Sequence, residues 1–276
     1  MKNQINNYPS VTKSYKGFYP FRIGTTSYIY PDLYVPNVRM LGTFVDEIEL
    51  LLFESGPIAA LLSKTVIAEL QHLSGELNLT YNIHLPTDIA VSNPNPEQRE
   101  RDIARLLKVI ERVERLAPST CTLHVPFSAE ASGHAAVEKW RDIVYTSLAK
   151  IVKSGVPAGR IAIESLDYPF TWIENIIQDL RLSICMDIGH LFIQGSDILA
   201  FFTKHADAVA IIHLHGVQNG KDHLPLDRLP ADRLRPVFEI LRKFKGTVSL
   251  EVFDYEYLQT SLDFLETCWH NSRRWC

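Results

Sequence analysis

Eight short apolar runs alternate with longer stretches of helical period, and this alternation limits the fold more than any other feature of the chain. Each run has the length and apolar character of a buried strand. Strands that alternate with helices in this way are typical of a parallel sheet built from βα units. The strands are expected at residues 21–27, 47–54, 79–85, 119–125, 160–165, 182–187, 208–215 and 247–253.

The stretches between these runs show helical periodicity. In residues 97–116, Ile103, Leu106 and Ile110 fall on one face and charged residues fall on the other. Asn95 followed by proline and glutamate is typical of a helix start. The segment after the first strand contains prolines and is left unassigned. Helices are expected at residues 58–73, 97–116, 134–153, 170–180, 196–205, 231–244 and 255–270.

Eight βα units in a chain of 276 residues predict an α/β fold, a single (β/α)8 TIM barrel. A doubly wound open sheet is the alternative, but its glycine-rich first turn is missing, because Gly24 stands alone and no P-loop occurs. The catalytic barrel is expected over residues 17–276. The polar residues 1–16 are expected to form a flexible leader.

Composition excludes several partner classes. No apolar run approaches the ~20 residues that a membrane helix needs, so no membrane association is expected. The net charge of −4 does not favour a nucleic-acid partner. The four cysteines form no C-x-x-C pair, which fits a reducing cytoplasm. The oligomeric state is left open.

Metal-ligating residue types stand at the carboxyl ends of six consecutive predicted strands. In a TIM barrel these ends form one rim, which carries the active site. Imidazole and carboxylate groups are ligands of Zn²⁺, Mn²⁺ and Fe²⁺. The six residues are His84, His124, Glu164, Asp187, His215 and Glu251.

A structural role is the alternative for each residue taken singly, since a lone histidine at a strand end is more often hydrogen-bonded than ligating. Six such explanations would have to hold at once on neighbouring strands. Three carboxylates on one rim would also repel one another and raise one another's pKa. Bound cations remove this repulsion, so a metal site is the better hypothesis.

Further candidates flank this rim. His213 and His215 have the same strand parity, so both can point inward; His215 is preferred as a ligand, and His213 is assigned to a deeper layer or to substrate binding. Hydroxyls at the end of the first strand can also contact substrate, although ordinary turn hydrogen bonding is equally compatible with them. The further candidate ligands are His190 and His223, and the candidate substrate contacts are Thr25, Thr26, Ser27, Tyr28, His213 and Asp222.

The motifs IHLP, LHVP, AIES, DIGH, HLHG, DHLPL and LEVF resemble those of the xylose isomerase-like TIM-barrel superfamily over residues 21–265. This superfamily contains sugar isomerases and epimerases and the endonuclease IV type of repair enzyme. The resemblance implies one ion held by Glu164, Asp187, His215 and Glu251. The endonuclease IV branch adds histidines matched here by His84, His124, His190 and His223. Its Asp-x-His pair is incomplete, because Lys221 stands where the aspartate would be, so the resemblance implies two ions rather than three.

The stretches RIGTTSYIYP, PNVRMLGTFVDEIELLLFES and YNIHLP look like the cobamide-remodelling phosphodiesterases of this superfamily. That resemblance implies metal-dependent hydrolysis of the phosphodiester in the nucleotide loop of a corrinoid, which releases cobinamide. Glu164 would bridge two divalent ions, zinc first and manganese or iron as alternatives, and Glu164 or Glu251 would act in catalysis. A sugar (phosphate) isomerase or epimerase, an apurinic-site endonuclease and a non-catalytic metal-dependent binding barrel are the alternatives.

Overall fold

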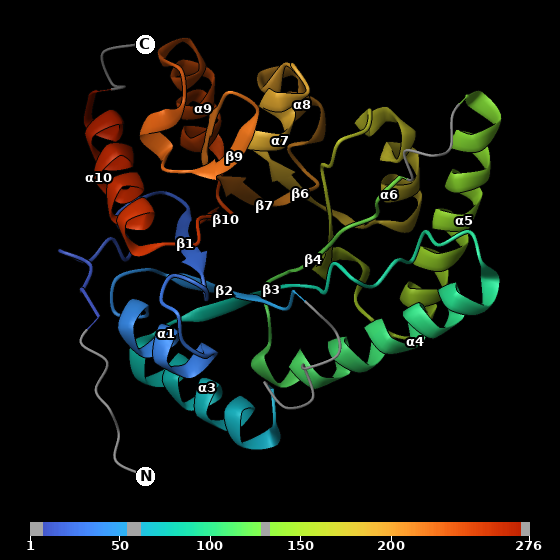
Figure 1. Ribbon diagram of the computed structural model, residues 1–276, viewed down its shortest axis with the longest axis horizontal. Helices are drawn as coiled ribbons and strands as arrows, with labels where there is room; N and C mark the ends of the chain where they lie inside the picture. Colours follow the sequence, from blue (N-terminus) through green and yellow to red (C-terminus); the bar gives the residue numbers. More distant parts are fainter. Residues whose placement is uncertain (1–7, 54–61, 128–132, 272–276) are drawn as a thin grey trace.

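A closed barrel of parallel strands forms the centre of the molecule (Figure 1). The computed structural model describes residues 8–53, 62–127 and 133–271. Within these residues, eight strands close in the order β1-β10-β7-β6-β5-β4-β3-β2, so the predicted TIM barrel is confirmed. The strands are β1 (Arg22–Thr26), β2 (Glu47–Leu51), β3 (Thr80–His84), β4 (Cys121–Leu123), β5 (Ile161–Glu164), β6 (Ser183–Asp187), β7 (Val209–Leu214) and β10 (Thr247–Leu250).

Helices surround the strands and follow them along the chain (Figure 1). The unassigned segment after the first strand contains α1, and the first four residues of the helix expected at 58–73 lie outside the described residues. The α-helices are α1 (Tyr34–Leu41), α3 (Lys64–Leu77), α4 (Pro96–Val113), α5 (His134–Lys153), α6 (Glu174–Leu180), α7 (Ile188–Ile193), α8 (Ile198–His205), α9 (Ala231–Lys243) and α10 (Tyr255–Asn271). Short 3-10 turns are η1 (Glu114–Leu116), η2 (Ala158–Arg160), η3 (Phe170–Trp172) and η4 (Leu226–Arg228).

Helix α4 begins at the residue that the start signal indicates. The Asn95 side chain accepts hydrogen bonds from the backbone N–H groups of Glu97 and Gln98, which the first helical turn would otherwise leave unpaired. Ile103 and Leu106 are buried in the core. The capping residue and the apolar face of the sequence therefore both predict the helix that the structure contains.

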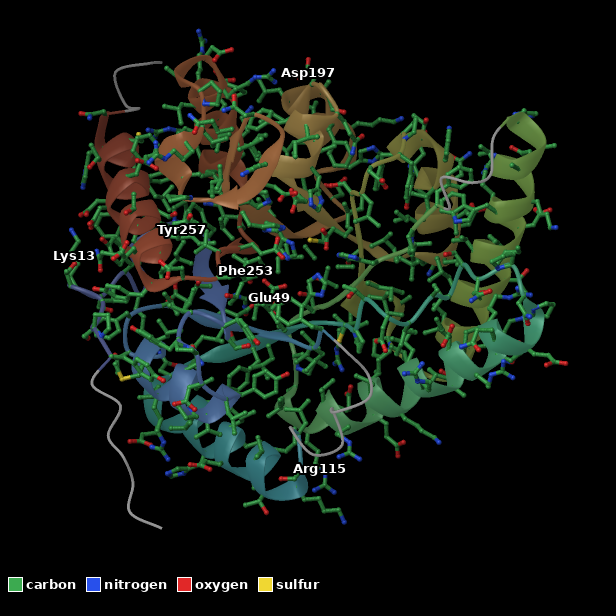
Figure 2. The ribbon with its side chains drawn as sticks, viewed as in Figure 1. Lys13, Glu49, Arg115, Asp197, Phe253 and Tyr257 are labelled. Carbon is green, nitrogen blue, oxygen red and sulfur yellow. The ribbon has the colours of Figure 1, made fainter. Side chains whose placement is uncertain are left out.

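The strands are buried on both faces, because helices cover them outside and side chains fill the barrel inside. All five residues of β2 are buried, and they include two carboxylates, Glu47 and Glu49. Glu49 lies among the central strands in Figure 2. Buried carboxylates require compensating partners, and Glu47 finds them in Asn82 and Ser119, at 3.0 and 2.7 Å.

The described part of the expected leader is packed rather than loose. Val11 and Tyr15 are buried. The backbone N–H of Thr12 donates to Gln259, and the Tyr15 hydroxyl donates to Asp263 at 3.1 Å, so residues 8–16 are held on α10. The reason is that Val11 and Tyr15 belong to the hydrophobic core, so this polar stretch is held by two buried side chains.

A two-stranded hairpin follows β7, where the sequence pattern indicated only a loop. It pairs β8 (Gly216–Gln218) with β9 (Lys221–Leu224) in antiparallel fashion. Asn219 and Gly220 connect the strands with positive φ angles of 54° and 75°. An Asn-Gly pair is the preferred two-residue hairpin turn, so a local signal for this element was present.

No helix in the described ranges is both long enough and apolar enough to span a bilayer.

Candidate metal centre

The eight candidate ligands converge at the carboxyl end of the barrel. Each contributes a nitrogen or oxygen atom to at least one group of three donors whose atoms lie within 4.8 Å of one another. The groups built from these eight residues are His84/His124/Glu164, Glu164/Asp187/His190, Asp187/His215/Glu251 and His190/His215/His223. The rim predicted from the strand ends is therefore present as a cluster of potential ligands.

Glu164 is the centre of one half of the cluster. Its Oε2 atom lies 2.9 Å from His124 Nε2 and 3.4 Å from His84 Nε2. Its Oε1 atom lies 3.3 Å from His190 Nδ1. Burial alone would raise the pKa of Glu164, but the charge of His124 and hydrogen bonds from all three imidazoles hold it well below its usual range. Glu164 is therefore a carboxylate between two sets of donors.

Asp187 ends β6 and caps α7. Its Oδ1 atom accepts the backbone N–H of His190 at 2.6 Å, and this bond places His190 one turn beyond the strand. Its Oδ2 atom faces the candidate metal centre and lies 3.2 Å from His215 Nε2. One carboxylate thus starts the helix and faces the metal-ligand cluster.

His213 and His215 both point into the barrel, as their shared parity predicts, but their surroundings differ. The His213 Nδ1 atom lies 3.0 Å from Glu251, 3.8 Å from Glu164 and 3.9 Å from Asp187. Burial lowers the pKa of His213, but neighbouring groups, with Cys185 and Glu251 foremost, raise it well above its ordinary value. His213, assigned to a deeper layer or to substrate binding, is fully buried and faces the three carboxylates directly.

Two buried atoms at this point lack a hydrogen-bond partner among the described residues. They are His213 Nδ1 and Glu251 Oε2. They lie 3.0 Å from each other but outside hydrogen-bond geometry, so they face each other without forming a hydrogen bond. A divalent cation accepts electron pairs from imidazole and carboxylate alike, and the donor set fits zinc, manganese or iron(II).

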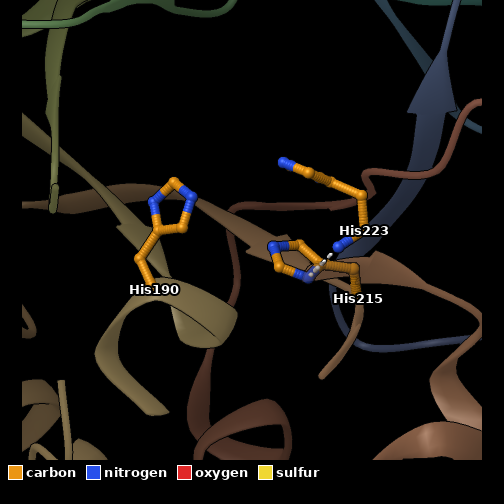
Figure 3. Close-up of side chains that lie close together, drawn as sticks. All are labelled: His190, His215 and His223. Carbon is orange, nitrogen blue, oxygen red and sulfur yellow. Dashed lines mark hydrogen bonds between the residues drawn. The ribbon is translucent and has the colours of Figure 1, made fainter. Parts of the chain in front are cut away.

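His215 and His223 form the other side of the cluster with His190 (Figure 3). The backbone N–H of His223 donates to His215 Nδ1 at 3.0 Å, and the two rings lie 4.4 Å apart between centroids. His223 has a positive φ of 49°, which is uncommon for a residue other than glycine. The β8–β9 hairpin thus brings His223 back over His215, which directly follows β7.

Asp222 lies on the same hairpin beside two of these rings. Its carboxylate oxygens lie 3.7 Å from His190 Nε2 and 4.0 Å from His223 Nε2. Lys221 occupies the position where the resemblance expects an aspartate. The adjacent Asp222 supplies a carboxylate close to that place.

Three of the predicted substrate contacts form hydrogen bonds with the backbone inside the barrel. Thr25 donates its hydroxyl to the Leu250 carbonyl oxygen, and Thr26 donates to the Val252 carbonyl oxygen. The Ser27 hydroxyl accepts the backbone N–H of Leu51. All three hydroxyls are buried and tie β1 to its neighbours, which is the ordinary hydrogen bonding that the sequence pattern left open as the alternative. Tyr28, in contrast, is 49% exposed.

The pattern of strand ends missed two inward residues. Glu49 contacts His213 Nε2 at 3.0 Å from the middle of β2. Cys185 lies on β6 within 4.8 Å of donor atoms of Glu164 and His213. Burial raises the pKa of the Cys185 thiol. The sequence did contain a signal for Glu49, because it is a charged residue inside an apolar strand.

The profile described as xylose isomerase-like TIM barrel matches residues 38–268. The chain therefore belongs to this family. A search of curated proteins finds no match.

Several solved structures share the fold. A D-tagatose 3-epimerase-like protein is 19% identical, with a TM-score of 0.77 over 92% of this chain and 99% of that one. The 3-keto-D-glucoside 4-epimerase from E. coli is 15% identical, with a TM-score of 0.71 over 90% and 100%. The IolI protein, solved with a zinc atom, is 13% identical, with a TM-score of 0.72 over 91% and 99%. At these identities the likeness concerns the fold.

Proposed function

We propose that this protein is a metal-dependent phosphodiesterase that binds two divalent ions, zinc foremost. One observation carries the proposal: imidazoles surround Glu164 in addition to the donors around Glu251. Asp187, His213 and Glu251 with Glu164 suffice for one ion, since a zinc site uses three or four protein ligands. His84 and His124 then remain on the other side of Glu164, where a second ion would be held.

The residues divide between two positions that share Glu164. His84 and His124 would hold one ion, and Asp187 with the two strand-seven histidines and Glu251 would hold the other. His190 and His223 stand where they can complete either coordination or contact a phosphate oxygen. Bound divalent ions in such a pair polarise a phosphodiester and lower the pKa of a coordinated water.

Glu251 is the carboxylate best placed to orient the attacking water. Both oxygens of Glu164 lie close to histidine nitrogens, at 2.9 and 3.3 Å, whereas Glu251 Oε2 lies 3.0 Å from His213 Nδ1 without forming a hydrogen bond with it. Burial would raise the pKa of Glu251, but the charge of His213 lowers it below the ordinary value. Glu251 therefore stays ionised and accepts a hydrogen bond from water.

An aromatic rim favours a substrate with a large flat portion. Tyr28, Phe53 and Phe253 are 49%, 40% and 37% exposed. Phe53 lies 5.1 Å from Tyr28 and 6.1 Å from Phe253 between ring centroids, and Phe253 lies 5.0 Å from His223. Exposed rings beside a candidate metal centre suit stacking against a planar group. A corrinoid joins such a ring to a phosphodiester, and the motif resemblance supports the same substrate.

A sugar (phosphate) epimerase or isomerase is the second candidate, and the comparisons favour it over the phosphodiesterase. Two of the structural neighbours carry the names of sugar epimerases. One ion held by Glu164, Asp187, a strand-seven histidine and Glu251 would suffice for that activity. His84 and His124 would then be dispensable, which separates the two candidates.

The test is incubation of zinc-loaded protein with several cobamides, followed by mass spectrometry. Cobinamide and a nucleotide phosphate are the expected products, with about two zinc ions per chain. The double variant H84A/H124A should lose one zinc and the hydrolysis. One zinc per chain, intact cobamides and epimerisation of ketoses that survives H84A/H124A would replace the first candidate by the second.

A further inference from the structure

Glu49 is a fully buried carboxylate outside the predicted ligand set. It lies in the middle of β2 and reaches across the barrel interior to β7, a strand with which β2 does not pair. Its Oε1 atom lies 3.0 Å from His213 Nε2, and its Oε2 atom accepts the Ser249 hydroxyl at 2.6 Å. Ser249 pairs in register with His213, so both partners approach Glu49 from one side of the barrel.

Both nitrogens of His213 face carboxylates, but on different sides of the ring. Nε2 meets the Glu49 carboxylate at 3.0 Å, outside the candidate metal centre. Nδ1 lies 3.0 Å from Glu251, 3.8 Å from Glu164 and 3.9 Å from Asp187, and it forms no hydrogen bond within the described residues. A cation held among these three carboxylates would take the place of a proton on Nδ1, while Glu49 would keep the proton on Nε2.

We propose that Glu49 is a positioning residue that fixes His213 as an Nδ1 metal ligand. This inference rests on the proposed metal-dependent function. A histidine ligand commonly donates its second N–H to a carboxylate, which sets the ring orientation and increases the basicity of the ligand. Ser249 holds the Glu49 carboxylate in turn, so the arrangement runs from Ser249 through Glu49 and His213 to the centre.

Glu47 provides a matched control on the same strand. It is equally buried, and its partners are Thr80, Asn82, Ser119 and Arg22 rather than a histidine. A purely structural need for buried carboxylates in β2 would make both residues equivalent. Only Glu49 contacts a donor of the candidate metal centre.

The experiment compares E49Q with E47Q in the full-length protein. Glutamine keeps the shape and can still accept from His213, but it removes the charge. Zinc dissociation constants are measured by competition with a chelator. We expect E49Q to bind zinc about 10–100-fold more weakly and E47Q to stay within about threefold of the parent protein.

A second readout follows the His213 ring in zinc-loaded protein. Long-range ¹H–¹⁵N spectra show which ring nitrogen keeps its proton, and we expect Nε2–H with zinc on Nδ1 in the parent protein and loss of this fixed form in E49A. Unchanged zinc affinity in E49Q, equal losses in E49Q and E47Q, or an Nδ1–H ring in the zinc-loaded parent protein would each overturn the inference. A parent protein that binds no zinc in the chelator competition would instead overturn the proposed function.

Discussion

At the residue scale, Gly189 decides how closely α7 approaches β7. A methyl group added there would overlap the His215 ring. Glycine is the residue that permits so close an approach of backbone to side chain. The glycine in the motif DIGH therefore serves the candidate metal centre by leaving room for an imidazole from another strand.

We expect G189A to displace His215, to destabilise the protein by about 1–3 kcal/mol through overpacking, and to weaken zinc binding. The control is G75A on the exposed side of α3, where an added methyl meets nothing within 4 Å. That change should stabilise the helix by up to about 1 kcal/mol. Urea unfolding measures the stability of both variants, and competition with a chelator measures their zinc affinity. Equal stability and equal zinc affinity in the two variants would contradict the packing role of Gly189.

Also at this scale, His190 makes the metal-free protein sensitive to pH. Burial lowers the pKa of His190, but a hydrogen bond to Glu164 and the charge of Asp187 raise it to about 10. A histidine pKa raised by folding stabilises the protein fully below the unfolded value of about 6.5, and this contribution is lost as pH rises through the folded value. Metal-free protein should therefore melt at lower temperature as pH rises across this window.

Zinc binding should show the opposite trend, because the ion must displace protons from the imidazoles. We expect zinc affinity to increase between about pH 6 and about pH 8, with proton release on binding. Calorimetry in buffers of different ionisation enthalpy measures both the zinc affinity and the number of protons released. An affinity that is constant over this range would contradict ligation by these histidines.

At the scale of elements, the β8–β9 hairpin completes one side of the candidate metal centre. It supplies the His223 ring, and its backbone holds His215. His223 adopts the left-handed region at φ 49°, whereas Lys221, on the same strand, is not among the residues with positive φ. The left-handed conformation costs a residue with a Cβ roughly 1–2 kcal/mol.

We expect H223G to be about 1 kcal/mol more stable than H223A in metal-free protein, because glycine adopts this conformation without strain. At Lys221 the order should reverse, with K221G about 0.5–1 kcal/mol less stable than K221A. Urea unfolding in the presence of a chelator compares the four variants. The same order at both positions would contradict strain at His223.

At the scale of the whole molecule, the candidate metal centre joins six strands that are distant in sequence. An ion bound there would link them in the folded state only, so removal of metal should destabilise the entire barrel. Zinc at 100 times its dissociation constant adds about 2.7 kcal/mol per site. For a chain of 276 residues that corresponds to a rise in Tm of roughly 5 °C per site.

The measurement is thermal unfolding with zinc and with a chelator. The double variant H84A/H124A should retain part of the zinc-dependent rise if two ions bind, because Asp187, His213 and Glu251 remain. Absence of any zinc-dependent change in the parent protein would contradict a structural contribution of metal. A full loss in the double variant would contradict separate positions for the two ions.

The sequence by itself determined the barrel and the set of residues at its rim. Eight apolar runs separated by helical periods permit few other folds, and parallel strands must place their carboxyl ends together. Six of the candidate ligands, from His84 to Glu251, could therefore be predicted from their places at strand ends. The Asn-Gly turn of the hairpin is also a local sequence signal, because it depends on two neighbouring residues alone.

Tertiary structure alone decided which nitrogen faces which carboxylate. The parity of β7 allowed both His213 and His215, and only closure of the barrel brings Glu49, from a strand 164 residues away in sequence, against His213 Nε2. The sequence likewise left two roles open for the hydroxyls of Thr25, Thr26 and Ser27, and their hydrogen bonds to neighbouring strands exist only in the folded barrel. Strand period is a local property of the chain, whereas the partner of a buried polar atom depends on contacts that exist only after the barrel has closed.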